Sequence, residues 1–497
     1  MSTRPVTPAR GLRCWLALVL LGTAFFMVIL DGTIVYVALP QIAADLGLPA
    51  GGVQWVMSAY LLCFGGLLLL GGRCADLLGR RRVFMAGVGL FVCSSLLCGL
   101  AWSPAALIGA RVVQGVSAAI MAPTALSIVM TVFPDGPERN RALGIWGGIG
   151  GVGATAGLLL GGPVTAVFGW QGVFFVNVPV GLAVLAFSRQ LLPESTGAGC
   201  PRCFDIAGAA AVTTALVLLI YGISGAPTAG WAGIQTIAPL GASAVLFGLF
   251  GLIEARSRGP LVPLRIFRAR ALAGGNLVLL TAGMSVDGAL LILTLYAQQV
   301  LGYSAVQFGL MTAVMTVTSA AGAYTAQAVV TRAGVSRVGA AGMTLAGTAC
   351  LLLTQVSVTG SYWPELFFAL LVFGAGLGSA FAASQIAALT GAAERESGLA
   401  AGLADSSFNI GSALGIAILS TVAVARAAPG AGPPAMTEGF QAAFAAAAGI
   451  ALLGALLALL LFQPKAPVAS TTAGPPPAPG AQPLDGRRGS NAGTRGQ

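Results

Sequence analysis

The sequence predicts an all-α membrane protein with fourteen transmembrane helices, arranged as two six-helix pseudo-repeats with two extra helices between them. Of its 497 residues, 57% are hydrophobic and only 8% are charged, whereas a soluble domain carries about 25% charged residues. Uncharged apolar stretches of about 20 residues recur along the chain, and each can cross the ~30 Å hydrocarbon core as a helix. Together these observations exclude a soluble fold.

The expected spans divide the chain into five parts. The first apolar stretch is much longer than the ~7–15-residue apolar region of a signal peptide, so it is expected to remain as the first helix. The parts are a cytoplasmic N-terminus at 1–13, an N-terminal six-helix half at 14–190, a linker with two extra transmembrane helices at 191–271, a C-terminal six-helix half at 272–462 and a disordered cytoplasmic tail at 463–497. The expected spans are 14–38, 53–71, 83–101, 104–127, 143–166, 171–190, 206–225, 234–254, 272–298, 308–330, 338–358, 365–388, 398–423 and 439–462.

The basic residues predict how the chain lies in the membrane. With both termini in the cytoplasm, all of the 25 Lys and Arg residues except Arg111 and Arg426 fall in cytoplasmic segments, in agreement with the positive-inside rule. The sequence therefore predicts a multi-pass protein of the cell membrane with an even number of spans. This placement also accounts for the net charge of +10 without a nucleic-acid partner.

An internal repeat is indicated by positions that recur with the same spacing. Asp31 precedes Gly79 by nearly the same number of residues as Asp287 precedes Gly334, so each half is expected to begin with a helix that carries a buried carboxylate. Parallel repeats around a central site are a known plan for transporters. The two sets are Gly79, Arg82 and Gly87, and Gly334, Arg337 and Gly342.

One carboxylate and one guanidinium are expected at matching depths in the membrane. At ~1.5 Å per residue, Asp31 lies about 13 Å below the outer end of the first helix and Arg111 about 10 Å below the outer end of the fourth. Because either charge alone is costly to bury, we expect the two to pair. Two interpretations follow: Asp31 alternates between Arg111 and a proton, or the residues form a fixed structural pair. The chain has no histidine, which favours a carboxylate as proton carrier.

Two further carboxylates lie in expected spans. Asp287 has no basic residue in its own span or the neighbouring ones, so it is expected to hold a proton until water reaches it. Asp405 lies beside Ser406 and Ser407 in the thirteenth span and belongs either to a hydrated polar patch or to the wall of a substrate cavity. The residues considered for that cavity are Tyr36, Gln114, Asp405 and Asn409.

Several motifs resemble those of the major facilitator superfamily, and specifically its fourteen-helix drug:proton antiporter branch. The resemblance covers nearly all of residues 14–462 and implies that the fourth-helix motif with Arg111 takes part in proton coupling. Asp31 and Asp287 are expected to take part as buried carboxylates. Tyr36 stands where this branch usually has asparagine. The matching segments are Leu30–Pro40 in the first helix, Gly72–Arg82 in the loop after the second, Arg111–Gly115 in the fourth, Trp170–Gly181 around the start of the sixth, and Tyr296–Ser304.

The loop at Gly72–Arg82 is expected to form a cytoplasmic gate. A carboxylate at Asp76 can pair across the loop and hold the inner side shut while the outside is open. The alternative is that the arginines serve only the topology of the chain. The gate residues are Asp76, Gly79, Arg80 and Arg82.

The fifth span carries glycines at every fourth position. Gly153, Gly157 and Gly161 form a stripe of small residues that lets another helix approach closely. The resemblance implies that this stripe is the antiporter motif of the family, although Leu158 stands where that motif usually has proline.

The function expected from these features is proton-coupled export of small lipophilic or amphipathic compounds, such as drugs or antibiotics, by alternating access. The energy source is the proton gradient, with no bound cofactor, and the expected partners are a small-molecule substrate and the lipid bilayer. No P-loop is present in the sequence. The sequence leaves the oligomeric state open.

Two other classes of function were considered. Proton-coupled uptake of a small nutrient would require more hydrogen-bonding and basic residues inside the spans than the sequence holds. A non-transporting sensor would need a folded output domain, and an intramembrane enzyme would need converging catalytic groups; neither is indicated. Cys200 and Cys203 form a single CxxC motif without histidines, so no metal site is predicted and the chain is not expected to be an enzyme.

Overall fold

The computed structural model describes residues 8–49, 51–133, 136–194, 205–257, 260, 262, 264–390, 397–427 and 432–462. The first seven residues of the expected N-terminal part lie outside the described residues. The expected tail at 463–497 and the pair Cys200 and Cys203 also lie outside them.

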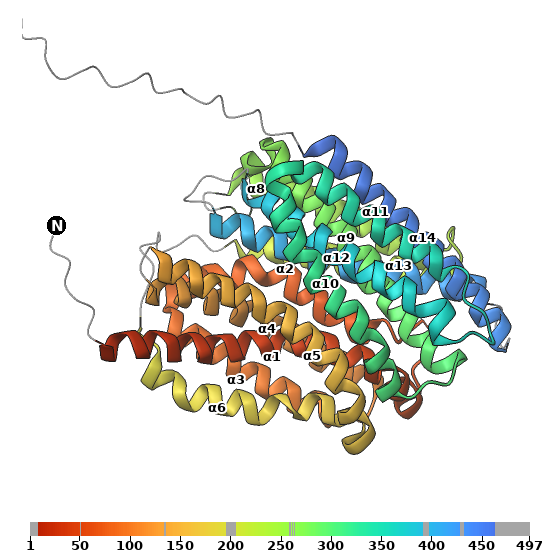
Figure 1. The fold of residues 1–497 in the computed structure, drawn as a ribbon, viewed down its shortest axis with the longest axis horizontal. Helices are drawn as coiled ribbons and strands as arrows, with labels where there is room; N and C mark the ends of the chain where they lie inside the picture. The colour runs from red at the N-terminus through yellow and green to blue at the C-terminus, as the bar shows by residue number, and fades with distance from the viewer. Residues whose placement is uncertain are drawn as a thin grey trace, which may run out of the picture. The chain divides into compact units, whose positions relative to one another are not determined.

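The described chain folds into long α-helices joined by short connections (Figure 1). The first six are α1 (Pro8–Leu46), α2 (Trp55–Leu78), α3 (Arg80–Gly99), α4 (Pro104–Val132), α5 (Pro137–Phe175) and α6 (Asn177–Leu191). Two helices follow, α7 (Ile206–Ala229) and α8 (Ile234–Arg256), and then the short 3-10 helix η1 (Leu264–Arg268). The remainder comprises α9 (Arg270–Leu295), the π-helical η2 (Tyr296–Val300), α10 (Ala305–Ala333), α11 (Val335–Leu353), the π-helical η3 (Tyr362–Phe367), α12 (Phe368–Thr390), α13 (Ser397–Arg426) and α14 (Pro433–Leu461).

Within the described residues, thirteen helical segments are long and apolar enough to cross a membrane. One of them, Pro137–Leu191, is 55 residues long and contains both α5 and α6. The backbone leaves the helical conformation inside this segment at Gly169, where φ is 71°. Figure 1 shows the chain reversing direction between α5 and α6. The protein thus has an all-helical membrane fold.

Local residue choices explain several helix ends. At the start of α10, the Ser304 hydroxyl accepts a hydrogen bond from the backbone N–H of Gln307 at 3.2 Å, and the Gln307 side chain accepts one from the backbone N–H of Ser304 at 2.8 Å. This reciprocal pair satisfies two N–H groups that the first turn leaves free. Gly79 and Gly334 end α2 and α10 with φ values of 101° and 85°, a backbone region that glycine adopts without the strain of a side chain.

The packing among α1 to α6 recurs among α9 to α14. Helix α1 packs on α5 and α2 on α4, just as α9 packs on α13 and α10 on α12. Helix α3 contacts α6 in the same way that α11 contacts α14. The two sets meet where α2 packs on α13 and α5 packs on α10. Helix α7 packs on α8 and α13, whereas α8 exposes many large apolar side chains.

The glycine stripe of α5 lies against α1, as the small-residue spacing predicts. A side chain at Gly157 would collide with Thr33 and with the backbone of α1. At Gly153 and Gly161, a methyl group would meet side-chain atoms of α1 at 3.1 and 3.0 Å. Glycine is therefore needed on α5 because the α1 backbone approaches this closely.

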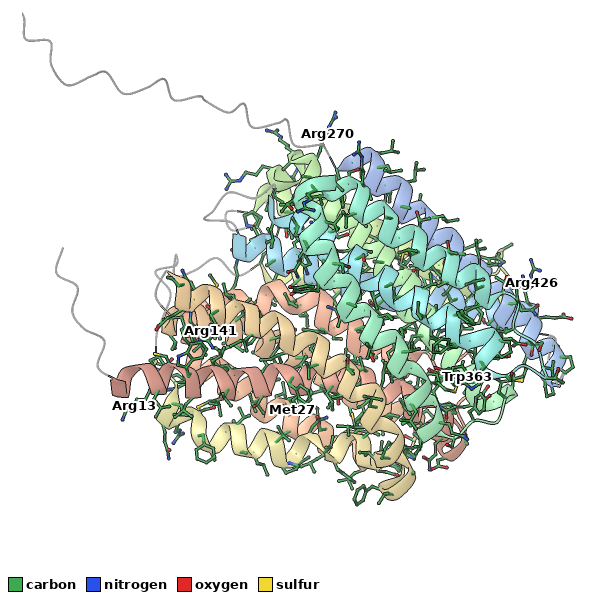
Figure 2. The ribbon with its side chains drawn as sticks, in the orientation of Figure 1. Arg13, Met27, Arg141, Arg270, Trp363 and Arg426 are labelled. Carbon is green, nitrogen blue, oxygen red and sulfur yellow. The ribbon has the colours of Figure 1, made fainter. Side chains whose placement is uncertain are left out.

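The bundle has two ends, which we name by their turns. The Gly79 end carries the α2–α3 and α10–α11 turns, and the Gly47 end carries the connection from α1 to α2. Figure 2 shows Arg13 and Arg141 at one end and Arg426 at the opposite end. Near the Gly47 end the two helix sets are in contact, and there Gln298 donates a hydrogen bond to the carbonyl of Val37 at 3.0 Å.

Candidate functional site

The centre of the candidate site is the carboxylate of Asp31 in α1. Arg111 Nη1 of α4 lies 2.6 Å from Asp31 Oδ2, so the ion pair expected from the matching depths is present. The other carboxylate oxygen, Oδ1, accepts hydrogen bonds from Gln114 of α4 at 2.9 Å and from Asn177 of α6 at 2.8 Å. Ser95 of α3 accepts a hydrogen bond from Gln114 at 2.8 Å. Four helices therefore converge on one carboxylate.

Arg111 is held by more than the carboxylate. Its Nε donates to the carbonyl of Val56 at 3.0 Å, and its Nη1 also donates to the side-chain oxygen of Gln114 at 2.8 Å. The guanidinium carbon lies 4.2 Å from the centre of the Tyr60 ring and 5.8 Å from that of Phe174, within the range of cation–π attraction. Nη2 has no hydrogen-bond partner among the described residues. The position of Arg111 is thus fixed by these contacts, while its Nη2 donor is unused within the described residues.

The ion pair and hydrogen bonds of Asp31 offset part of the cost of burying its charge. Every contact to the carboxylate comes from a donor, and Asp31 and Arg111 are both fully buried. A charge taken out of water needs such partners, because an unpaired buried charge is strongly destabilising. The role of the pair in proton coupling stays a prediction.

Two members of this cluster were not identified from the sequence. Asn177 lies inside the Trp170–Gly181 motif but was not assigned a role there, and Ser95 lies in an otherwise apolar span. The available signal was that a polar amide inside a membrane helix needs a partner. The sequence alone does not tell which partner that is.

Two of the residues considered for a substrate cavity lie in the buried core instead. Gln114 is fully buried and uses its amide within the Asp31 cluster. Tyr36 is only 2% exposed, and its hydroxyl has no hydrogen-bond partner among the described residues. In this structure both side chains face neighbouring helices, and their placement in a substrate cavity stays a prediction.

The carboxylate of Asp287 in α9 has no basic partner. It makes no ion pair with a described residue, which agrees with the sequence, and its side chain is half-buried. Tyr36 of α1 and Ser412 of α13 lie within electrostatic range. Asp287 thus occupies the position in the second repeat that Asp31 occupies in the first, but without the guanidinium.

Asp405 and Asn409 lie on one face of α13. Asp405 is exposed, and its carboxylate accepts a hydrogen bond from Gln385 of α12 at 3.0 Å. Asn409 donates to the backbone carbonyl of Asp405 at 2.8 Å and packs beside Gly65 of α2. This polar face therefore lies where the two helix sets meet, as a substrate-cavity residue would require.

The expected gate has a partner that the sequence analysis missed. Glu194, which follows α6, lies 3.3 Å from Arg81 and 3.6 Å from Arg82. Arg80 donates a hydrogen bond to the hydroxyl of Thr131 in α4. The side chain of Asp76 lies outside the described residues, so its place in a gate stays a prediction. The signal that could have identified Glu194 was an acidic residue directly after a span, on the side of the membrane where the basic residues gather.

Gly79 fits this junction for two reasons. Its φ of 101° suits glycine, and a methyl group there would come within 2.8 Å of a Glu194 carboxylate oxygen.

Within the described residues, no group of three or more His, Cys, Asp or Glu side chains could hold a metal ion.

Comparison with known proteins agrees with this fold. The sequence profile of the Major Facilitator Superfamily matches residues 21–280 and 275–485. The puromycin resistance protein pur8 of Streptomyces alboniger is 36% identical over 93% of each chain. The tetracenomycin C resistance and export protein of Streptomyces glaucescens is 34% identical over 84% of this chain and 78% of its own. In a crystal structure, the peptide transporter POT shares the fold with a TM-score of 0.66 and 19% identity, covering 89% of this chain and 93% of its own.

These findings define a multi-pass membrane transporter. The chain belongs to the Major Facilitator Superfamily.

Proposed function

We propose that the chain exports antibiotic-like or drug-like small molecules in exchange for protons. The observation that carries this proposal is the buried Asp31–Arg111 pair, a charge that can be neutralised by a proton in one state and by a guanidinium in another. The relatives named for puromycin resistance and for tetracenomycin C resistance and export support an antibiotic-like substrate. The apolar composition of the spans favours lipophilic or amphipathic molecules.

We propose fourteen crossings, with both termini in the cytoplasm. At ~1.5 Å per residue, the helical segment Pro137–Leu191 is about 80 Å long, more than twice the ~30 Å hydrocarbon core. The turn at Gly169 lets it cross twice, which raises the thirteen segments to fourteen crossings. The parts at 14–190, 191–271 and 272–462 then form a six-helix half, a two-helix linker and a second half, in line with the repeated packing.

This topology predicts which segments a reagent can reach from outside. In a cysteine-free variant, single cysteines placed in 226–233 are expected to react with a membrane-impermeant maleimide added to intact cells. Cysteines placed in 255–270 are expected to react only after the membrane is opened. Reaction of the second set in intact cells would contradict fourteen crossings with the termini inside.

The state in the structure is, in this proposal, the one open to the cytoplasm. The halves touch near the Gly47 end through Gln298 and Val37, and through the close approach of Gly162 on α5 to Val306 on α10. Asp405 remains exposed. Arg81 and Arg82 pair with Glu194 of their own half, and neither forms an ion pair with a described residue of the other half. Export would proceed by closing the Gly79 end and opening the Gly47 end.

Proton-driven accumulation is the direct test. In vesicles that expose the Gly79 end and are acidic inside, an amphipathic drug such as puromycin is expected to accumulate. For one-to-one exchange, a gradient of one pH unit supports about a tenfold concentration ratio, because a tenfold ratio corresponds to ~1.4 kcal/mol. A protonophore is expected to remove the accumulation. Movement that is indifferent to the gradient would contradict proton coupling, and accumulation only in the reverse direction would indicate uptake.

A further inference from the structure

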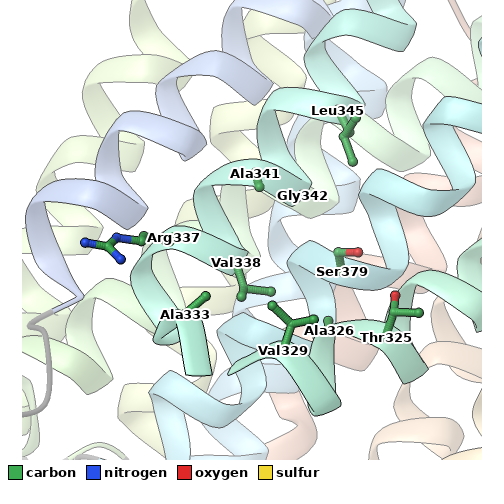
Figure 3. A pocket seen from close by; sticks show the side chains of 10 residues that line it. All are labelled: Thr325, Ala326, Val329, Ala333, Arg337, Val338, Ala341, Gly342, Leu345 and Ser379. Atoms are coloured by element: carbon green, nitrogen blue, oxygen red, sulfur yellow. The ribbon is translucent and has the colours of Figure 1, made fainter. Parts of the chain in front are cut away.

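A groove on the second half is lined by residues that do not belong to the candidate site described above. It has a volume of about 330 Å³ and lies between α10 and α11, with α12 beneath it (Figure 3). Its walls are mainly aliphatic, and Arg337 is the charged residue among those that line it. The volume falls in the range of about 300–1,000 Å³ that holds small molecules.

The groove spans the boundary of the membrane. Helices α10 and α11 are both candidate membrane spans, and the turn at Gly334 joins them. Arg337 lies in the first turn of α11, at the polar edge of the span, whereas Val338, Ala341 and Leu345 continue into the apolar part. Figure 3 shows the guanidinium pointing away from the aliphatic side chains, at one end of the groove. The groove therefore has an apolar body and a positively charged mouth.

Arg337 differs in its ion pairing from Arg82, the arginine at the equivalent position of the first repeat. Arg82 occupies the equivalent position in the first half and lies 3.6 Å from Glu194. Arg337 is exposed and forms no ion pair or hydrogen bond with a described residue. Among the described residues, the first half thus supplies a carboxylate for this arginine, whereas the second half supplies none and the arginine lies beside an apolar groove.

We propose that this groove binds an anionic phospholipid of the surrounding bilayer. The headgroup phosphate lies against Arg337, and one acyl chain lies along the aliphatic wall between α10 and α11. A guanidinium matches the geometry of phosphate oxygens and forms charge-assisted hydrogen bonds with them. Basic pockets between membrane helices on the cytoplasmic side are suited to anionic headgroups. A neutral phospholipid could fill the groove, but its headgroup would interact less favourably with Arg337.

The test measures lipid binding, so it does not depend on transport. The purified full chain is titrated with phosphatidylglycerol or with phosphatidylcholine of the same acyl chains, and bound lipid is counted by native mass spectrometry. Wild type is expected to bind one phosphatidylglycerol about five- to tenfold more tightly than phosphatidylcholine, since a basic residue near the surface contributes ~1 kcal/mol or slightly more. Arg337→Gln is expected to lose this preference.

Matched variants separate the groove from the general charge of this end. Arg332 is also exposed and lies just before the turn but does not line the groove, so Arg332→Gln should keep the preference. Ala341→Phe fills the groove and should weaken the binding of both lipids, whereas Thr348→Phe, exposed further along α11, should not. A preference that survives Arg337→Gln, or that Arg332→Gln removes equally, would overturn the proposal. Displacement of the lipid by inorganic phosphate alone would show that the acyl groove contributes nothing and would overturn it as well.

Discussion

Asp31→Asn is expected to abolish proton-driven export when equal amounts of the variant and of wild type are compared in the membrane. An amide cannot carry the proton, yet it fits the same space and keeps an acceptor for Gln114 and Asn177. The expected result in vesicles with an imposed pH gradient is loss of the whole gradient-driven accumulation. Movement of the drug down its own concentration gradient can remain.

The same helix provides a matched control for this variant. Asp45 is also a carboxylate of α1, but it is exposed near the Gly47 end and accepts a hydrogen bond from Trp170 at 2.9 Å. Asp45→Asn is expected to keep accumulation close to that of wild type. Uphill transport that persists in Asp31→Asn vesicles would remove Asp31 from the coupling mechanism.

The second large effect is expected on stability, in variants that break the pair between Asp31 and Arg111. Arg111→Met leaves the carboxylate buried without its counter-charge, and Asp31→Asn does the same to the guanidinium. Breaking a buried pair by removing one partner costs about 3–5 kcal/mol. Asp31 keeps two amide donors in Arg111→Met, so the cost should be greater in Asp31→Asn, where the arginine loses its only carboxylate.

The double variant distinguishes the two interpretations of the pair. With both charges removed, stability is expected to return toward that of wild type, because replacing a buried ion pair by neutral groups of similar size is often tolerated. Proton-driven transport is not expected to return. Melting temperature in detergent and accumulation in vesicles are measured for all three variants, with the exposed Arg426→Met as control. Recovery of both properties would make the pair structural, and unchanged stability in both single variants would contradict the pairing.

The fold was largely predictable from the sequence because the bilayer imposes a simple rule. A backbone in hydrocarbon must satisfy its own hydrogen bonds, so each long apolar stretch becomes a helix. The helices nevertheless extend beyond the apolar stretches. For example, α1 runs over Pro8–Leu46 where the sequence predicted 14–38, and α5 over Pro137–Phe175 where it predicted 143–166. Hydropathy detects the part of a helix in hydrocarbon, whereas the helix itself continues into the polar boundary.

From the sequence, the candidate site was predictable only in its depth within the membrane. Counting residues along α1 and α4 gives the depth of Asp31 and Arg111, and depth was sufficient to pair them. Depth does not give the rotation of a helix about its axis or the identity of its neighbours. For that reason the contacts of Gln114 and Asn177 with the carboxylate were not predicted from the sequence.

The sequence by itself determined that the chain is a bundle of membrane helices, that its basic residues favour one orientation, and that Asp31 and Arg111 lie at one level. These properties follow from composition and from distance along single helices. Only the tertiary structure decided that α3 and α6 contribute Ser95 and Asn177 to the site, and that Glu194 rather than a residue of the same loop lies at Arg81. Such contacts join segments far apart in the chain, and they arise from the close packing of particular helix faces, which no local pattern specifies.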